Sequence, residues 1–207
     1  MFDRVPEPAL MEGRDQCEYY NREFIDYPEM IPEFIEQHNK FAGVYHGHVI
    51  DLGSGSCNFV IELCKLYSQL SFTCYEASKE MIKIARQNIA NAKLEHRITI
   101  VEDDLFNAVG RFDLVIANRV LHHVNDTEKF WKLINSLSNN VLVCDLERPN
   151  SLDDFQDSFS EDLKNSFMAA YTVEEVTKQV NNYNYNIVKE ADENGLCTFV
   201  VFTNKDT

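Results

Sequence analysis

Residues 48–58 read His-Val-Ile-Asp-Leu-Gly-Ser-Gly-Ser-Cys-Asn and decide the fold. The run begins with a short, mostly apolar stretch typical of a buried strand and continues into a tight loop that carries two glycines. Residues 58–67 then place apolar side chains at helical spacing. A strand, a glycine loop and a helix in this order predict the first β-α unit of a parallel sheet.

The same alternation of strands and helices continues along the chain. Apolar runs predict strands, and amphipathic stretches predict the helices between them. Asn194 and Gly195 are typical of a tight hairpin turn, which makes the last strand antiparallel. We therefore expect an α/β fold with a mostly parallel, seven-stranded sheet covered by helices on both faces. The expected strands are residues 48–52, 71–76, 97–101, 112–117, 141–146, 185–190 and 196–203.

Two segments lie outside this regular pattern. Residues 1–42 are expected to form an N-terminal helical cap segment, because apolar side chains recur at helical spacing from Met30 to Phe41. Residues 43–207 are expected to form the sheet domain, with an acidic, helical insert at about 151–182. A chain of 207 residues is long enough for one domain of this kind with a small appendage.

Composition and charge exclude several classes of protein. The sequence is 44% hydrophobic and 26% charged, which excludes a disordered or fibrous chain. Its 34 acidic and 19 basic residues give a net charge of −15, so direct binding to nucleic acid is not expected without a basic partner. The six cysteines form no C-x-x-C pair, which indicates free thiols in the core. No targeting segment or long apolar run is visible, so we expect a cytoplasmic protein that binds no membrane.

The glycine loop is suited to approach a ligand closely. In an open α/β sheet, ligands bind at the carboxyl ends of the strands, where the free N–H groups of the next helix face an anionic group. A nicotinamide-binding loop needs a third glycine where this chain has Asn58. What remains is an acid, Asp51, followed by Gly53 and Gly55. This arrangement resembles motif I of class I S-adenosylmethionine (SAM)-dependent methyltransferases, which often have a further glycine in place of Cys57.

The end of the second strand continues the resemblance. Residues 76–81 read Glu-Ala-Ser-Lys-Glu-Met and are similar to the family's acid-x-Ser-x-x-Met run. A carboxylate at the tip of this strand accepts hydrogen bonds from both ribose hydroxyls and excludes a 2′-phosphate. The resemblance implies that Glu76 binds the ribose of SAM and that Ala77 and Met81 flank its adenine.

The third and fourth strand ends extend the resemblance to about residues 45–146. At the third, it implies that Asp104, or else Asp103, accepts a hydrogen bond from the adenine amino group while Leu105 covers the ring. Residues 112–124 read Phe-Asp-Leu-Val-Ile-Ala-Asn-Arg-Val-Leu-His-His-Val and resemble the pattern of small-molecule methyltransferases. The resemblance implies a Rossmann-like fold and methyl transfer from SAM to a small molecule or a protein side chain.

Further residues are assigned from their places beside these motifs. The loop at Gly53 and Ser54, together with Asn118, is expected to hold the methionine end of SAM, with Asp51 tuning the loop. Tyr20 is expected to close over the cofactor. It follows another tyrosine, and two adjacent side chains cannot both point into one core from one helix face.

The acceptor side of the site is less defined. If the acceptor must lose a proton, His123 is the preferred general base and His122 the second candidate; a packing or helix-capping pair is the alternative. No metal site is expected. Positions 118–121 read Asn-Arg-Val-Leu, so the N/D-P-P-Y/F motif that binds amide acceptors is absent. Two other functions remain open: an aminopropyl-type transferase that uses decarboxylated SAM, and a non-catalytic SAM-binding or interaction protein.

Overall fold

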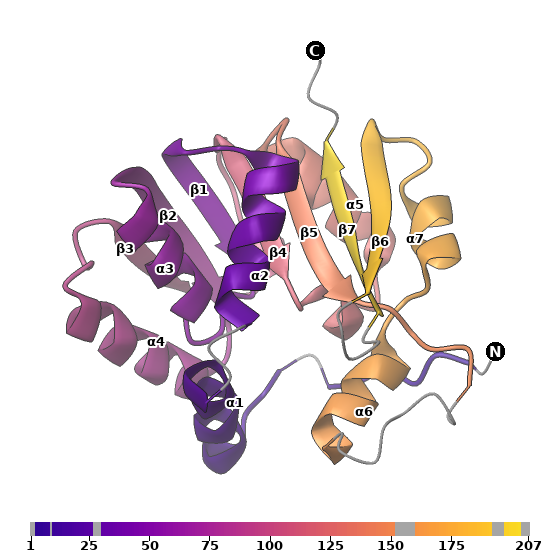
Figure 1. The fold of residues 1–207 in the computed structure, drawn as a ribbon, viewed down its shortest axis with the longest axis horizontal. Helices are drawn as coiled ribbons and strands as arrows, with labels where there is room; N and C mark the ends of the chain where they lie inside the picture. Colours follow the sequence, from indigo (N-terminus) through magenta and orange to yellow (C-terminus); the bar gives the residue numbers. More distant parts are fainter. Residues whose placement is uncertain (1–2, 9, 27–29, 152–159, 192–196, 204–207) are drawn as a thin grey trace.

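The computed structural model describes residues 3–8, 10–26, 30–151, 160–191 and 197–203. Seven strands form one sheet in the order β3-β2-β1-β4-β5-β7-β6 (Figure 1). β1 to β5 pair in parallel, and β7 pairs antiparallel with both β5 and β6. The predicted mostly parallel sheet with an antiparallel last strand is confirmed. The strands are β1 (His46–Leu52), β2 (Gln69–Glu76), β3 (Ile98–Glu102), β4 (Leu114–Asn118), β5 (Val141–Leu146), β6 (Tyr185–Ala191) and β7 (Cys197–Thr203).

Helices cover both faces of the sheet. They are α1 (Arg14–Asp26), α2 (Met30–Gln37), α3 (Asn58–Leu66), α4 (Lys79–Ala92), α5 (Thr127–Leu137), α6 (Glu161–Ala169) and α7 (Val173–Gln179), with a π-helical turn η1 (His38–Ala42) after α2. Residues of α2, α3 and α4 join the core on one face, and residues of α5 and α7 join the core on the other. Successive strand residues point to opposite faces, so Val49 lies in the first core and Ile50 in the second.

Capping residues set where the helices leave the carboxyl edge of the sheet. The hydroxyl oxygen of Ser78 accepts a hydrogen bond from the backbone N–H of Met81 at 3.3 Å and caps α4. A carboxylate oxygen of Asp126 accepts from the backbone N–H of Lys129 at 3.0 Å and caps α5. These caps fix the loops that follow β2 and β4, where ligand-binding residues are expected.

The N-terminal segment differs from the prediction, because its first part is not helical. Residues 3–8 and 10–13, called the strap below, precede the start of α1 at Arg14. Pro6 and Pro8 lack the N–H that a helix interior needs, and the strap bonds to distant backbone instead. The backbone N–H of Val5, for example, donates to the carbonyl of Met168 in α6 at 3.0 Å. Figure 1 shows α1 and α6 beyond the carboxyl ends of the parallel strands, with the strap running between them.

Other predicted features are confirmed or fall outside the described residues. Within the described residues, the insert forms α6 and α7, whereas residues 152–159 and the predicted turn at 194–195 lie outside. The described cysteines are free and buried, as expected; they are Cys17, Cys57, Cys64, Cys74 and Cys144. No helix among the described residues is long and apolar enough to span a membrane.

Candidate active site

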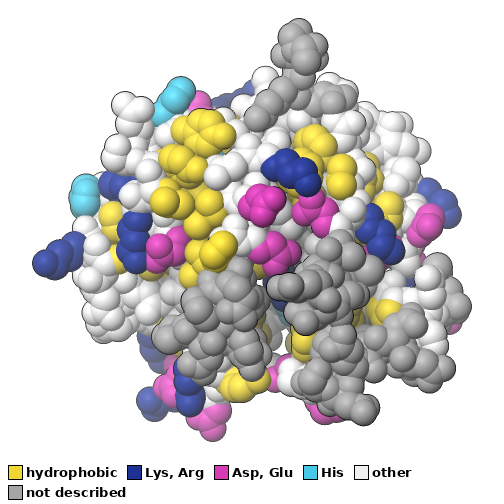
Figure 2. Space-filling view, in the orientation of Figure 1, with side chains coloured by type: hydrophobic (Ala, Val, Ile, Leu, Met, Phe, Trp, Pro, Cys, Tyr) yellow, Lys and Arg dark blue, Asp and Glu magenta, His cyan; other side chains and the backbone are white. Residues whose placement is uncertain are grey.

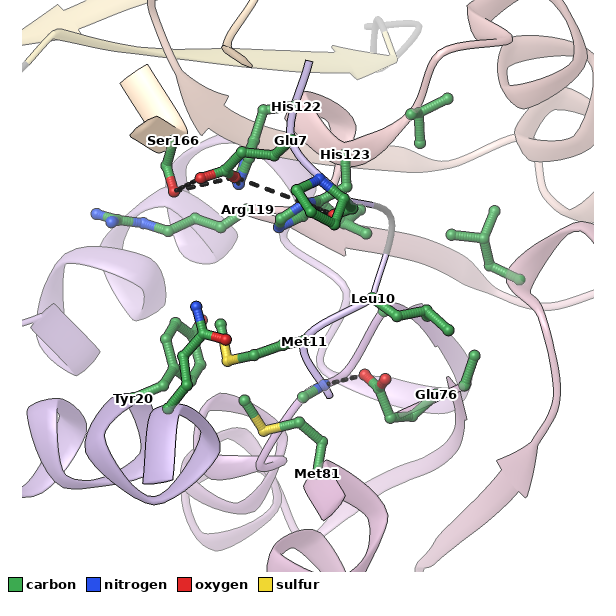
Figure 3. Close-up of a pocket in the computed structure, with 18 of the residues that line it drawn as sticks. Glu7, Leu10, Met11, Tyr20, Glu76, Met81, Arg119, His122, His123 and Ser166 are labelled. Atoms are coloured by element: carbon green, nitrogen blue, oxygen red, sulfur yellow. Dashed lines mark hydrogen bonds and ion pairs between the residues drawn. The ribbon is translucent and has the colours of Figure 1, made fainter. Parts of the chain in front are cut away.

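A cavity of about 550 Å³ opens at the carboxyl edge of the parallel strands. The loop after β1, the end of β2 and the loop after β4 form its floor, and the strap, α1 and α6 close its sides (Figure 3). Its volume lies within the range of about 300–1,000 Å³ that is usual for small-molecule sites. The fold therefore presents its cavity where open α/β sheets bind ligands.

Most of the predicted site residues line this cavity. They are Tyr20, Gly53, Gly55, Glu76, Ala77, Met81, Asp104, Leu105, His122 and His123. Asp51, Ser54 and Asn118 do not line it. Sequence reasoning missed Glu7 from the strap, Arg119 after β4 and Ser166 from α6, which also line the cavity.

The glycine loop is shaped by two different constraints. Gly53 and Gly55 both have left-handed backbone, with φ of 72° and 51°. A Cβ on Gly53 would lie 2.4 Å from Cγ2 of Val120, so this glycine lets the loops after β1 and β4 meet. A Cβ on Gly55 would meet only the ring of Tyr20, at 3.7 Å, so this glycine faces open space. Cys57 is also left-handed, with φ of 59°, where the family often has glycine.

Glu76 is held at the end of β2 by backbone donors. Its Oε2 accepts from the N–H of Gly55 at 2.8 Å, and its Oε1 accepts from the N–H of Ser78 at 2.8 Å. The carboxylate therefore ties the glycine loop to the start of α4. In the next loop, Oδ1 of Asp104 accepts from the N–H of Phe106 at 2.8 Å. Two fixed carboxylates thus stand at neighbouring strand ends.

Asp51 lies buried beneath the glycine loop, in the ladder between β2 and β4. Burial, and secondarily the charge of Glu76, raises the pKa of its carboxyl to about 7. Asp51 is therefore close to half-protonated at neutral pH. Because Asp51 lies under the glycine loop and does not line the cavity, it can affect a ligand only through the position of that loop.

His122 is oriented by a buried carboxylate. Its Nδ1 lies 2.7 Å from Oδ1 of Asp145, and its backbone N–H donates to Oδ2 of the same residue at 3.0 Å. Burial opposes ionisation of Asp145, but the charge of His122 and hydrogen bonds to the carboxylate prevail and lower its pKa. The carboxylate accepts, so Nδ1 of His122 carries the proton and Nε2 is left as the basic atom. This Nε2 lies 3.8 Å from Oε2 of Glu7.

His123 is placed differently, although it also lines the cavity. Its Nδ1 donates to the carbonyl of Pro8 in the strap at 3.0 Å. Burial, and secondarily the charge of His122, lowers the pKa of His123 to about 4. His123 is therefore neutral at pH 7. Burial also raises the pKa of Glu7, whose carboxylate accepts from the hydroxyl of Ser166 at 3.2 Å (Figure 3).

Glu7, His122 and His123 also form the candidate metal cluster among the described residues. One ligand atom from each lies within 4.8 Å of the others. The sequence analysis expected no metal site and did not consider Glu7, which is distant from the histidines along the chain. A glutamate and two histidines are a donor set suited to zinc or iron.

The strand order and the cavity at the carboxyl edge define an α/β domain with a ligand-sized cavity at the place where open α/β sheets bind ligands. A model of a family described as a methyltransferase domain matches residues 45–192. The chain therefore belongs to this methyltransferase family, and its identification from the motifs as a class I SAM-dependent methyltransferase is confirmed.

Solved structures support the fold. A candidate SAM-dependent methyltransferase from Methanococcus maripaludis is similar with a TM-score of 0.71 at 19% identity, over 98% of each chain. The plantazolicin methyltransferase BpumL, solved with S-adenosylhomocysteine (SAH) and a pentazolic desmethylPZN analogue, is similar with a TM-score of 0.68 at 15% identity, over 92% of this chain and 91% of that one.

Curated relatives are matched over part of their length. The release factor glutamine methyltransferase of Rhodopirellula baltica is 30% identical over 73 residues, which are 34% of this chain and 25% of the relative. The chain spans less than half of the curated relatives that it matches first.

Proposed function

We propose that this chain transfers the methyl group of SAM to a small molecule, or to a protein side chain, that enters the same cavity. One observation carries the proposal: a single cavity is lined by Glu76 and Asp104 and by His122, which Asp145 backs. When bound, SAM supplies a methyl group on a positively charged sulfur. The task of the chain is to hold donor and acceptor in line and to exclude water.

The lining residues fit such a cofactor. Glu76 and Asp104 offer carboxylates to the ribose hydroxyls and the adenine amino group, and Met81 and Leu105 offer apolar flanks to the ring. Gly55 leaves open space beside this region. Asn118 lies behind the cavity lining, and its buried Oδ1 atom has no hydrogen-bond partner among the described residues.

Three further residues act on the cofactor from the edges of the cavity in this proposal. Asp51 tunes the glycine loop from below, and Ser54 fixes it, since its backbone N–H donates to the carbonyl of Tyr75 at 3.2 Å. Tyr20 contributes its ring from α1, which places an aromatic side chain over the loop at Gly55.

The strap holds the acceptor side closed. Arg4 donates from Nε to the carbonyl of Ala169 at 2.6 Å and from Nη2 to the carbonyl of His122 at 2.7 Å. Its guanidinium also lies 4.3 Å from the ring centroid of Tyr171. This one side chain joins the strap to α6 and to the loop after β4, which keeps solvent from the histidines.

His122 is the first candidate for general base in this proposal, with His123 the second. A base needs a free nitrogen that faces the acceptor and a partner that fixes the ring. Asp145 supplies that partner to His122, whereas His123 bonds only to a strap carbonyl. Sequence reasoning preferred His123, because it could not place Asp145 beside either ring.

The chain's own residues restrict the class of methyl acceptor that we propose. The amide-binding motif is absent at positions 118–121, so the glutamine named for the relatives is not proposed as the substrate here. Figure 2 shows basic side chains interspersed with acidic ones on the face in view. With a net charge of −15, this supports a small acceptor over nucleic acid. The free cysteines support a cytoplasmic location.

Product analysis tests the proposal. The protein is incubated with methyl-labelled SAM and a panel of small hydroxyl, amine and thiol compounds and peptides, and SAH release and the labelled product are measured. Label transferred to an acceptor supports the proposal. Release of methylthioadenosine from decarboxylated SAM would favour the aminopropyl alternative, and SAM binding without transfer to any class would favour a non-catalytic binder.

A further inference from the structure

Arg119 is the one lysine or arginine among the described residues that line the cavity. It follows directly after β4 and is half-buried. Acidic side chains line the cavity elsewhere; they are Glu7, Glu76, Asp104, Asp126 and Asp162. A single permanent cation in such a setting marks a local position where an anionic group can be accepted.

The guanidinium of Arg119 has no carboxylate at ion-pair distance and no hydrogen-bond acceptor among the described residues. The guanidinium lies over the ring of Phe34 in α2, whose centroid is 5.6 Å from Cζ. Two other shielded arginines are tied to protein acceptors: Arg97 donates to the carbonyls of Cys64 and Leu70, and Arg148 donates to the carbonyl of Ala170 and to Glu175. Arg119 is half-buried and thus keeps its guanidinium donors available to a ligand in the cavity.

The backbone of Arg119 is also held in a costly conformation. Its φ is 53°, in the left-handed region that non-glycine residues rarely adopt. Its backbone N–H donates to the carbonyl of Cys144 at 2.8 Å, which extends the β4–β5 ladder by one bond beyond Asn118. The next residue, Val120, packs against Gly53. Strain of this kind persists where the surroundings impose it and is common at ligand sites.

We propose that Arg119 is the carboxylate receptor of the cavity. A guanidinium presents a planar fork of donors that matches a carboxylate in bidentate fashion. Figure 3 shows Arg119 and Glu76 on opposite sides of the cavity, so a ligand whose nucleoside lies at Glu76 would present its far end to Arg119. The inference rests on the proposed function, in which that ligand is SAM.

Two sources could supply the carboxylate. The amino-acid end of SAM carries one, and an acceptor that is itself a carboxylic acid carries another. In the first case Arg119 also discriminates against decarboxylated SAM, because an unpaired guanidinium would be left in the cavity. This would distinguish a methyltransferase from the aminopropyl alternative by one side chain.

A ligand pair isolates the role of Arg119. Calorimetry compares SAH, which has the carboxylate, with methylthioadenosine, which has the same nucleoside and sulfur but no amino-acid end. Arg119→Gln keeps the strained backbone and removes the charge. We expect this variant to weaken SAH binding by about 10- to 100-fold, the usual range for a shielded charge-assisted hydrogen bond. The affinity for methylthioadenosine should change by no more than about twofold.

Two further variants serve as controls. Arg119→Lys keeps the charge but not the fork, so we expect an intermediate loss for SAH. Arg86 is an exposed arginine of α4 that pairs with Glu102 at 3.5 Å and does not line the cavity. Arg86→Gln is therefore expected to leave the affinity for both ligands unchanged. Retained binding of methylthioadenosine by Arg119→Gln shows that the variant is folded.

Each remaining outcome decides the inference. If SAH binding is unchanged in Arg119→Gln, benzoate and acetate are titrated into the SAH-saturated proteins; binding to the wild type that the variant lacks assigns the carboxylate to the acceptor. If neither arm shows a loss, or if SAH and methylthioadenosine weaken equally, the receptor role is overturned. Failure of the wild type to bind either nucleoside instead refutes the proposed function itself.

Discussion

Nδ1 of His122 lies 2.7 Å from Oδ1 of Asp145, and both side chains are almost fully buried. The two residues come from neighbouring strand ends, with His122 after β4 and Asp145 within β5. The contact fixes both the orientation and the tautomer of the ring and leaves Nε2 as the basic atom. An imidazole whose ring is fixed by a buried carboxylate is the arrangement expected of a general base.

His122→Gln is expected to lower turnover of a proton-bearing acceptor by about 10²- to 10⁴-fold, while SAH affinity stays within a few-fold. Asp145→Asn should lose part of the same activity, because an amide can present a donor to the ring and favour the wrong tautomer. His123→Gln should lose less. Rates at saturating SAM over pH 6–9 check this. Full turnover by His122→Gln across that range would remove the base role.

Asp51→Asn is expected to stabilise the ligand-free protein at neutral and higher pH. The folded pKa of Asp51 is raised from 3.8 to about 7, so the unfolded chain releases this proton first and stability falls as pH rises from about 4 to 7. Asparagine removes that loss of folding stability, which amounts to at most about 4 kcal/mol. Urea unfolding at pH 5 and pH 8 measures the difference. A gap between the two proteins that does not widen with pH would contradict the assignment.

Glu76→Gln is expected to weaken SAH binding by about 10- to 100-fold, because the charged acceptor for the ribose hydroxyls is lost. Glu102→Gln is a matched control, since Glu102 pairs with Glu76 across β2 and β3 but does not line the cavity. Calorimetry of both variants checks the prediction. Equal losses in the two variants would mean that Glu76 acts through general charge and not through contact with the ligand.

Removal of divalent metal is expected to leave turnover unchanged, because Nδ1 of His123, which lies 3.6 Å from Oε2 of Glu7, already donates to the carbonyl of Pro8 and is not free to bind an ion. The measurement is the transfer rate after exhaustive treatment with EDTA. A rate that collapses and returns with zinc or iron would instead make Glu7, His122 and His123 a metal site. Glu7→Gln should then lose the metal response.

The parallel sheet and the nucleoside end of the site could be predicted because their signals are local. The strand that ends at Glu76, the glycine loop and the cap at Ser78 each show in a few adjacent residues. Tyr20 could be singled out only as one of two adjacent tyrosines; in the structure Tyr19 is exposed while Tyr20 packs on the core beside the glycine loop.

The acceptor side could not be predicted, because long-range contacts build it. Helical periodicity does not reveal that the strap is extended, since the bonds of Arg4 to Ala169 and His122 join segments far apart in sequence. Glu7 lies beside the histidines only because the strap runs across the structure in this way. Asp145 did carry a signal in the sequence, because it is an acid near the end of a predicted strand. Its role beside His122 could be seen only once β4, which precedes the histidine pair, was known to lie next to β5.

The most direct test of the central claim is calorimetric titration of the purified chain with SAM and SAH, with NAD as the control. We predict binding of both sulfur nucleosides at micromolar concentration and no response to NAD, because Glu76 and Asp104 suit a ribose and adenine while the loop lacks a third glycine at Asn58. A folded protein that binds neither SAM nor SAH would contradict the account.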